Sequence, residues 1–232
     1  MKYKVLGDSD CPLAEIDLSD GSSIKLENGC MAYMQDVNLE GRMNTEKKGF
    51  KGFMSAVGRS LTSGENFFIS TAYGTGSDAR IGIAPAIPGK IVCLKVGDQQ
   101  YRLNTGAFLA CDDSVNYDMK RQELGKAVFA GTGGLFVMET RGEGDVLVSA
   151  FGDLLELEVR PGKELAIDNE HVVAWDASLS YDIAVASGTF GFKTGEGLVN
   201  RFNGSGRVWI QTRNIHSLAD AIRVFIPTQS SN

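Results

Sequence analysis

The chain has 232 residues, of which 43% are hydrophobic and 22% charged, and this composition fits a globular protein that buries its own core. Its formal net charge of −6 opposes a general role in binding nucleic acid, because such affinity comes from clustered Lys and Arg. No apolar run approaches the ~20 residues that span a bilayer, and the first residues lack a secretory signal. We therefore predict a cytoplasmic protein.

Short strands are predicted from the first residues onward. The chain contains 28 Gly and 5 Pro, which indicates many tight turns. Apolar and polar residues alternate with period two, which is typical of half-buried strands. Four stretches show this alternation: 14–18, 23–26, 90–96 and 153–159.

A basic amphipathic segment interrupts the strand pattern near residues 49–61, where apolar residues recur at helical spacing. Such a helix can lie on a membrane surface or dock a protein partner, and it can equally cover the end of a β core. We name six residues as the partner or membrane contact: Lys47, Lys48, Phe50, Lys51, Phe53 and Arg59.

The next feature is an internal repeat. Residues 107–119 return at a constant offset as residues 171–183, and a fainter third copy lies at 32–40. A Gly-x-Gly turn closes each copy, at Gly74/Gly76, Gly142/Gly144 and Gly204/Gly206. Asp112 and Asp176 recur with the repeat, and an acid needed in each copy fits a structural turn better than a single active site.

This repeat predicts an all-β protein of three antiparallel units that pack with pseudo-threefold symmetry. We place the units at 1–84, 85–151 and 152–212 of one compact domain, and a C-terminal helix and tail at 213–232. Ser217 is the expected N-cap of that helix, which would span 217–225 and end before Pro227.

The sequence offers no catalytic constellation. His171 and His216 are the only histidines, and the four cysteines, Cys11, Cys30, Cys93 and Cys111, form no Cys-x-x-Cys pair. We predict free thiols, no metal, no cofactor and no catalytic residue. Ser114 and Ser178 are repeat-equivalent and lack a matching base, so a structural hydroxyl is expected at both.

Several glycine-rich motifs resemble a known family. Residues 64–68, 88–90, 106–110 and 195–213 together look like the altered inheritance of mitochondria protein 24 family. The resemblance implies three units in one chain, each with a fold similar to the trp RNA-binding attenuation protein, and it does not imply an enzyme. Mitochondrial members of the family are linked to organisation of the inner membrane, whereas bacterial members lack an assigned activity.

We therefore expect a non-enzymatic scaffold or binding protein, associated with a membrane or partner through residues 47–61. The alternatives are a small-molecule or carbohydrate binder, or a hydrolase, with a cleft between units, and a nucleic-acid binder by analogy of fold. A cleft would first be sought at Arg141, Glu143, Glu170 and His171. The three units can close within one chain, or exposed edge strands can pair into a homo-oligomer.

Overall fold

The computed structural model describes residues 1–42, 69–104, 106–121, 136–185 and 198–226. In these residues, nearly all of the regular structure is antiparallel β-sheet, as predicted, with one α-helix, α3 (Ile215–Arg223), and one 3-10 turn, η1 (Asn169–His171). The predicted helix at 49–61 lies outside the described residues.

The strands follow one order of pairing in three consecutive segments. In the first segment, β2 (Leu13–Asp17), β7 (Arg80–Ile83) and β4 (Met31–Gln35) pair in that order, and β6 (Ile69–Gly74) lies between β5 (Val37–Arg42) and β3 (Ser23–Glu27). In the middle segment, the corresponding strands are β8 (Ile91–Val96), β13 (Gly144–Ser149) and β10 (Phe108–Asp112), then β12 (Phe136–Gly142) between β11 (Val115–Arg121) and β9 (Tyr101–Asn104). In the last segment, they are β14 (Leu154–Val159), β19 (Gly206–Gln211) and β16 (Val172–Asp176), then β18 (Leu198–Asn203) between β17 (Ser180–Val185) and β15 (Leu165–Asp168).

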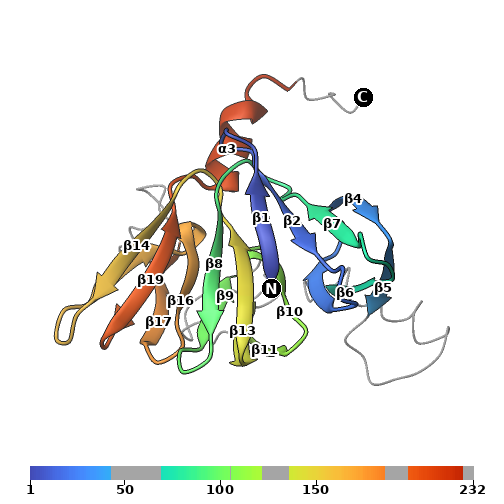
Figure 1. Ribbon diagram of the computed structural model, residues 1–232. Helices are drawn as coiled ribbons and strands as arrows, with labels where there is room; N and C mark the ends of the chain where they lie inside the picture. The colour runs from blue at the N-terminus through green and yellow to red at the C-terminus, as the bar shows by residue number, and fades with distance from the viewer. Residues whose placement is uncertain (43–68, 105, 122–135, 186–197, 227–232) are drawn as a thin grey trace, which may run out of the picture.

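Neighbouring segments share their sheets. Strand β3 pairs with β10 and strand β9 pairs with β16, which creates two six-stranded sheets, each built from half of one segment and half of the next. The remaining halves form a four-stranded sheet, in which β1 (Lys2–Leu6) is added beside β2, and a three-stranded sheet. Figure 1 shows the last segment on the left, the middle segment in the centre and the first segment on the right.

The predicted alternation corresponds to observed strands. Strand β3 buries every second residue, and β9 does the same, so each presents one face to the core. Among the described residues, the hydrophobic core forms three clusters, and each contains residues of at least two segments, as shared sheets require. Trp175, Phe108 and Phe202 are the largest fully buried side chains.

Strands β4, β10 and β16 have the same β-bulge in their pairing with β7, β13 and β19, and this bulge aligns Tyr33 with Ala110 and Ala174. The connection from β4 to β5 is a single residue, Asp36, which takes a left-handed φ of 50° and makes the turn shorter than its counterparts.

One local prediction was wrong. The N-cap of α3 is Asn214, whose side chain accepts a hydrogen bond from the Ser217 amide at 2.7 Å, so the helix begins at Ile215 and Ser217 lies inside it. His171 ends η1, and β16 begins at the next residue.

Candidate functional site

Asp112 and Asp176 hold the ends of two hairpins. Asp112 Oδ2 accepts a hydrogen bond from the Asp145 amide at 2.7 Å, and Asp176 Oδ2 accepts one from the Arg207 amide at 2.8 Å. Each aspartate lies on a strand that pairs directly with the strand following a Gly-x-Gly turn. These contacts give both aspartates a structural part in the described fold. In β4, Gln35 stands at the corresponding position.

The turn glycines leave room for these carboxylates. A Cβ at Gly144 or at Gly206 would lie 2.9 Å from the aspartate oxygen, closer than side chains pack. Gly142 and Gly204 have φ of +91° and +123°, a region that favours glycine. In the first segment, a Cβ at Gly74 would meet the Leu18 carbonyl and one at Gly76 would meet Asp36.

The four residues expected around a cleft lie in two separate places. Arg141, on β12, forms an ion pair with Asp118, and the backbone carbonyl of Glu143 accepts a hydrogen bond from Ser114 Oγ. Glu170 and His171 belong to η1, where His171 Nδ1 lies 2.7 Å from the Gln211 carbonyl oxygen. No described contact joins the two pairs.

A cleft does lie between segments, although most of its residues were not predicted. It has a volume of about 360 Å³, within the range of ~300–1,000 Å³ typical of small-molecule sites. The first segment contributes Glu27, the middle segment Asn104, Ala107 and Ser149, and the last segment Asn169, Glu170, Val172, Val173 and Gln211, with Ile215 and His216 of α3 at one side.

The polar groups of this cleft are partly fixed by the fold. Asn104 Nδ2 donates to the backbone oxygens of Asn169 and Val172, at 3.1 and 3.0 Å, and thereby ties β9 to the start of β16. Burial raises the pKa of the Glu27 carboxyl. Asn169 Oδ1 is buried without a hydrogen-bond partner among the described residues. The cleft therefore offers acceptors to a small ligand that carries N–H or O–H donors.

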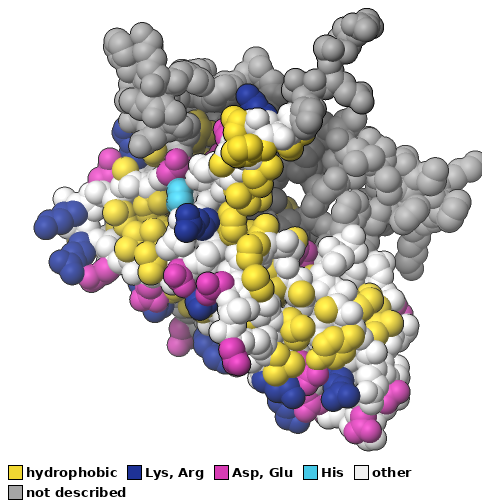
Figure 2. Space-filling model, turned by 90° about the horizontal axis from the view of Figure 1, so that it is seen from above, with side chains coloured by type: hydrophobic (Ala, Val, Ile, Leu, Met, Phe, Trp, Pro, Cys, Tyr) yellow, Lys and Arg dark blue, Asp and Glu magenta, His cyan; other side chains and the backbone are white. Residues whose placement is uncertain are grey.

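A second candidate surface is the apolar pole, which consists of α3 and the three residues after it. None of the nine residues of α3 is buried. Six large apolar side chains are instead exposed: Ile215 (49%), Leu218 (40%), Ile222 (47%), Val224 (78%), Phe225 (83%) and Ile226 (59%). Figure 1 shows α3 projecting above the sheets, and Figure 2 looks down on this end, where hydrophobic side chains gather.

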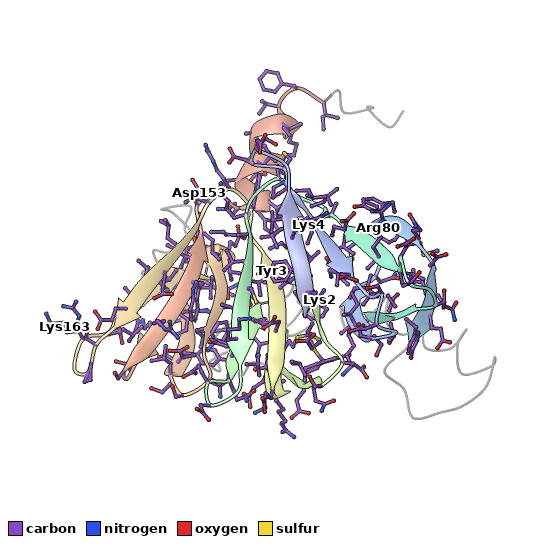
Figure 3. The ribbon with its side chains drawn as sticks, viewed as in Figure 1. Lys2, Tyr3, Lys4, Arg80, Asp153 and Lys163 are labelled. Carbon is purple, nitrogen blue, oxygen red and sulfur yellow. The ribbon has the colours of Figure 1, made fainter. Side chains whose placement is uncertain are left out.

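A third surface is a shallow groove of about 640 Å³ over β1, β2 and β7. Lys2, Lys4 and Arg80 lie along it (Figure 3), but each has a partner in the same groove. Lys2 Nζ is 3.7 Å from Asp17, Lys4 Nζ is 2.8 Å from Glu15, and the Arg80 guanidinium donates to Gln35 at 2.9 Å. Because these partners occupy the cations, the groove is poorly suited to a phosphate backbone.

The described residues show little that points to redox or metal chemistry. Cys11, Cys30, Cys93 and Cys111 are free thiols, and burial raises the pKa of Cys30 and of Cys111 to about 12, which disfavours the reactive thiolate. Within the described part of the chain, no three His, Cys, Asp or Glu side chains gather in a way that would hold a metal ion. No described helix is long and apolar enough to cross a membrane.

Comparisons with known proteins identify one matching family model and two similar streptococcal proteins. A family model described as mitochondrial biogenesis AIM24 matches residues 3–213. The uncharacterized protein M6_Spy0233 of Streptococcus pyogenes serotype M6 is 42% identical over 233 residues, which covers 100% of this chain and 93% of that protein. The crystal structure of protein SPYM3_0169 from Streptococcus pyogenes is similar, with a TM-score of 0.80 and 40% identity over 97% of this chain and 99% of that chain.

Proposed function

This chain belongs to the AIM24 family, and we propose that it is a non-enzymatic β scaffold of three similar units that docks on a lipid surface through its apolar pole. The family resemblance predicted from the sequence is confirmed. The similarity of each unit to the trp RNA-binding attenuation protein and the pseudo-threefold symmetry stay predictions, supported by the common order of strand pairing. The proposal places the protein in the cytoplasm, in line with its free thiols.

The exposure of α3 carries the proposal. An amphipathic helix normally gains its stability by burying its apolar face, yet Leu218 and Ile222 are 40% and 47% exposed. Covering such surface contributes about 25 cal/mol per Å² of apolar area. A partner that covers the apolar pole is therefore favoured.

A lipid surface fits this pole better than water or a strongly charged partner does. Phe225 and Ile226 extend the apolar face beyond the end of the helix. Arg213 is exposed just before the helix, and Arg223 is exposed in its last turn, 3.7 Å from Asp220. Interfacial helices bury their apolar face at the boundary of the acyl chains, while basic residues contact anionic headgroups. Because a single short contact binds weakly, we propose that the predicted basic amphipathic segment at residues 47–61 supplies a second one.

The test is co-sedimentation with phosphatidylcholine vesicles, with and without phosphatidylserine. We expect binding that increases with phosphatidylserine, and a loss of at least about tenfold in affinity for Ile222→Glu and for Phe225→Glu. Leu155→Glu is the matched control, because Leu155 is an equally exposed leucine, at 47%, on strand β14. The double variant Phe50→Glu/Phe53→Glu measures the contribution of the predicted segment.

Two results would contradict lipid docking. One is a wild-type protein that binds neither type of vesicle, and the other is binding that Ile222→Glu and Leu155→Glu weaken equally. Thermal unfolding of each variant controls for folding, and all three single substitutions replace exposed side chains, so we expect each to change stability by only about 0.5 kcal/mol.

A second candidate function is the binding of a small, donor-rich molecule in the cleft between segments. Asn169, whose Oδ1 has no partner among the described residues, and the partly buried Glu27 both line the cleft, which favours this candidate. Native mass spectrometry of protein from its own host tests this candidate, with Ala107→Leu as the variant that narrows the cleft. An adduct that is lost in Ala107→Leu supports a ligand, and a spectrum with no adduct counts against one.

A further inference from the structure

Two of the described strands lack the neighbour through which their counterparts join adjacent segments. Strand β4 pairs with β7 as β10 pairs with β13 and β16 with β19, but among the described strands only β10 and β16 have a second neighbour, β3 and β9 respectively. Strand β15 pairs with β18 as β3 pairs with β6 and β9 with β12, but among the described strands it has no second neighbour. The described part of the chain thus leaves one strand of each kind at an open edge.

The other open edges have a different origin. Strands β5, β11 and β17 are outer edges in all three segments, and β8 and β14 are the opposite edges of the two large sheets. Strand β2, the counterpart of β8 and β14, is covered on that side by β1. Among the described strands, only β4 and β15 occupy positions that join two segments elsewhere in the chain, so these two edges are complementary to each other.

Side-chain exposure marks β4 as an uncovered surface. Its apolar residues Met31, Tyr33 and Met34 are 39%, 37% and 46% exposed. At the corresponding positions of β10, the exposed fractions of Phe108, Ala110 and Cys111 are only 1%, 0% and 1%. In β16, Val172, Ala174 and Trp175 are 3%, 0% and 0% exposed. A large apolar edge of this kind is unusual for a strand that faces water.

We infer that β15 of one copy pairs with β4 of a second copy of this chain. The two internal junctions set the register: Leu26 faces Ala110 and Lys25 faces Cys111, and likewise Leu103 faces Ala174 and Arg102 faces Trp175. The same register places Ile167 opposite Tyr33 and Ala166 opposite Met34. The shared sheet then runs β17-β18-β15-β4-β7-β2-β1, with the first three strands from one copy and the other four from the next.

A second copy is a better occupant than the chain's own other end. In Figure 1, β4 lies at the right end of the molecule, whereas β17, in the same three-stranded sheet as β15, lies on the left beyond the middle segment. The contact is head-to-tail, because each copy uses a different edge. Repetition of this contact produces a closed ring or an open filament.

One position indicates that this junction is weaker than the internal ones. Lys25 Nζ donates to the carbonyl oxygens of Asp113 and Val115 at 2.7 and 2.8 Å, and Arg102 Nη1 donates to the Leu179 carbonyl at 3.2 Å. Each cation thereby clasps the turn of the neighbouring segment. In β15, Ala166 occupies the position of Lys25 and Arg102. The junction between copies therefore lacks this hydrogen bond, and we expect it to form only at higher protein concentration.

Sedimentation velocity without lipid tests the pairing. We expect wild-type protein to associate as its concentration rises, Met34→Lys to remain monomeric, and Ala166→Lys to lower the dissociation constant by about tenfold, since it restores a charged hydrogen bond. Leu155→Lys, which adds a charge to the edge strand β14, should associate like wild type. Monomeric wild type and monomeric Ala166→Lys at every concentration would overturn the inference.

Cysteine cross-linking tests the register and separates the two ways of closing the sheet. Met34→Cys and Ala166→Cys in one chain should oxidise to a ladder of covalent multimers on a denaturing gel, and a mixture of the single variants should stop at dimers. A monomer cross-linked to itself would mean that the sheet closes within one chain. Wild type controls for its own four cysteines. Because no vesicle is present, failure here leaves the lipid proposal standing, and the reverse also holds.

Discussion

The two internal junctions have the same pairing and different chemistry. At the first junction (β3–β10), Lys25 donates to backbone carbonyls, and Cys111 occupies the core position beside it. At the second junction (β9–β16), Arg102 also pairs with Glu139 and lies 5.5 Å from the Tyr181 ring centroid, and Trp175 occupies the core position. The junction geometry is therefore independent of the size of the buried side chain.

This difference shows where the stability of each junction comes from. Trp175 packs edge-to-face against Tyr181 and Phe202, at centroid distances of 4.9 and 5.6 Å, whereas Cys111 is a small side chain in a different core cluster. Aromatic pairs add to the free energy gained by burial. We expect the second junction to lose more stability on truncation than the first.

The largest expected effect is that of Trp175→Ala. Removing this fully buried ring should destabilise the protein by about 3–5 kcal/mol, against about 1 kcal/mol for Cys111→Ala, as measured by guanidinium unfolding. Trp175→Phe is the matched control, because it keeps an aromatic ring and removes an indole N–H that has no partner among the described residues. Equal costs for the two alanine variants would contradict the comparison.

The sequence was sufficient to predict an all-β protein but not the sharing of sheets. Period-two alternation predicted β3 and β8 because one face of each strand is buried, which is a local property. Pairing of β3 with β10 joins residues far apart in the chain, and no local pattern encodes it. The single-residue turn at Asp36 could not be predicted for the same reason, since only the register of β4 shows it.

The candidate surfaces were predicted in part. A C-terminal helix was predicted and α3 confirms it, but the exposure of Leu218 and Ile222 depends on what packs over them, which the sequence does not contain. The cleft was expected only as an alternative, and of the four residues named for it, Glu170 lines it. Glu27 and Asn169 have no motif, because different segments bring them together.

A smaller difference in unfolding free energy should distinguish Arg102 from Lys25, the two cations that donate to carbonyl oxygens of the neighbouring segment. Arg102→Ala removes the ion pair to Glu139 at 2.7 Å and the hydrogen bond to the Leu179 carbonyl, and should cost about 2–3 kcal/mol. Lys25→Ala removes two hydrogen bonds to carbonyl oxygens from a more flexible side chain, and about 1 kcal/mol is expected. Urea unfolding measures both costs. Arg102→Lys should restore less than half of the loss, and full restoration would mean that charge alone matters.

The smallest expected effect, about 1 kcal/mol or less, is a pH dependence of the unfolding free energy, which has opposite signs for two glutamates. Burial opposes ionisation of Glu139, but its hydrogen bonds to Lys120 and Arg102 outweigh burial and hold the pKa of this carboxyl below its ordinary value. Its contribution to stability is therefore present above the unfolded pKa of about 4.3 and is lost as the pH falls through the lower folded pKa.

Glu27 should show the reverse. Burial raises the pKa of Glu27 above the unfolded value, so the folded state holds its proton more tightly and loses stability as the pH rises from about 4.3 through the raised folded pKa. Unfolding free energies of Glu139→Gln and Glu27→Gln, measured by urea between about pH 3 and pH 7, test both signs. Relative to wild type, Glu27→Gln should become more stable as the pH rises, and Glu139→Gln less stable. If the stability differences of the two variants from wild type change in the same direction with pH, a partner compensates the charge of the partly buried Glu27 carboxyl. The cleft would then carry less negative charge than its lining residues indicate.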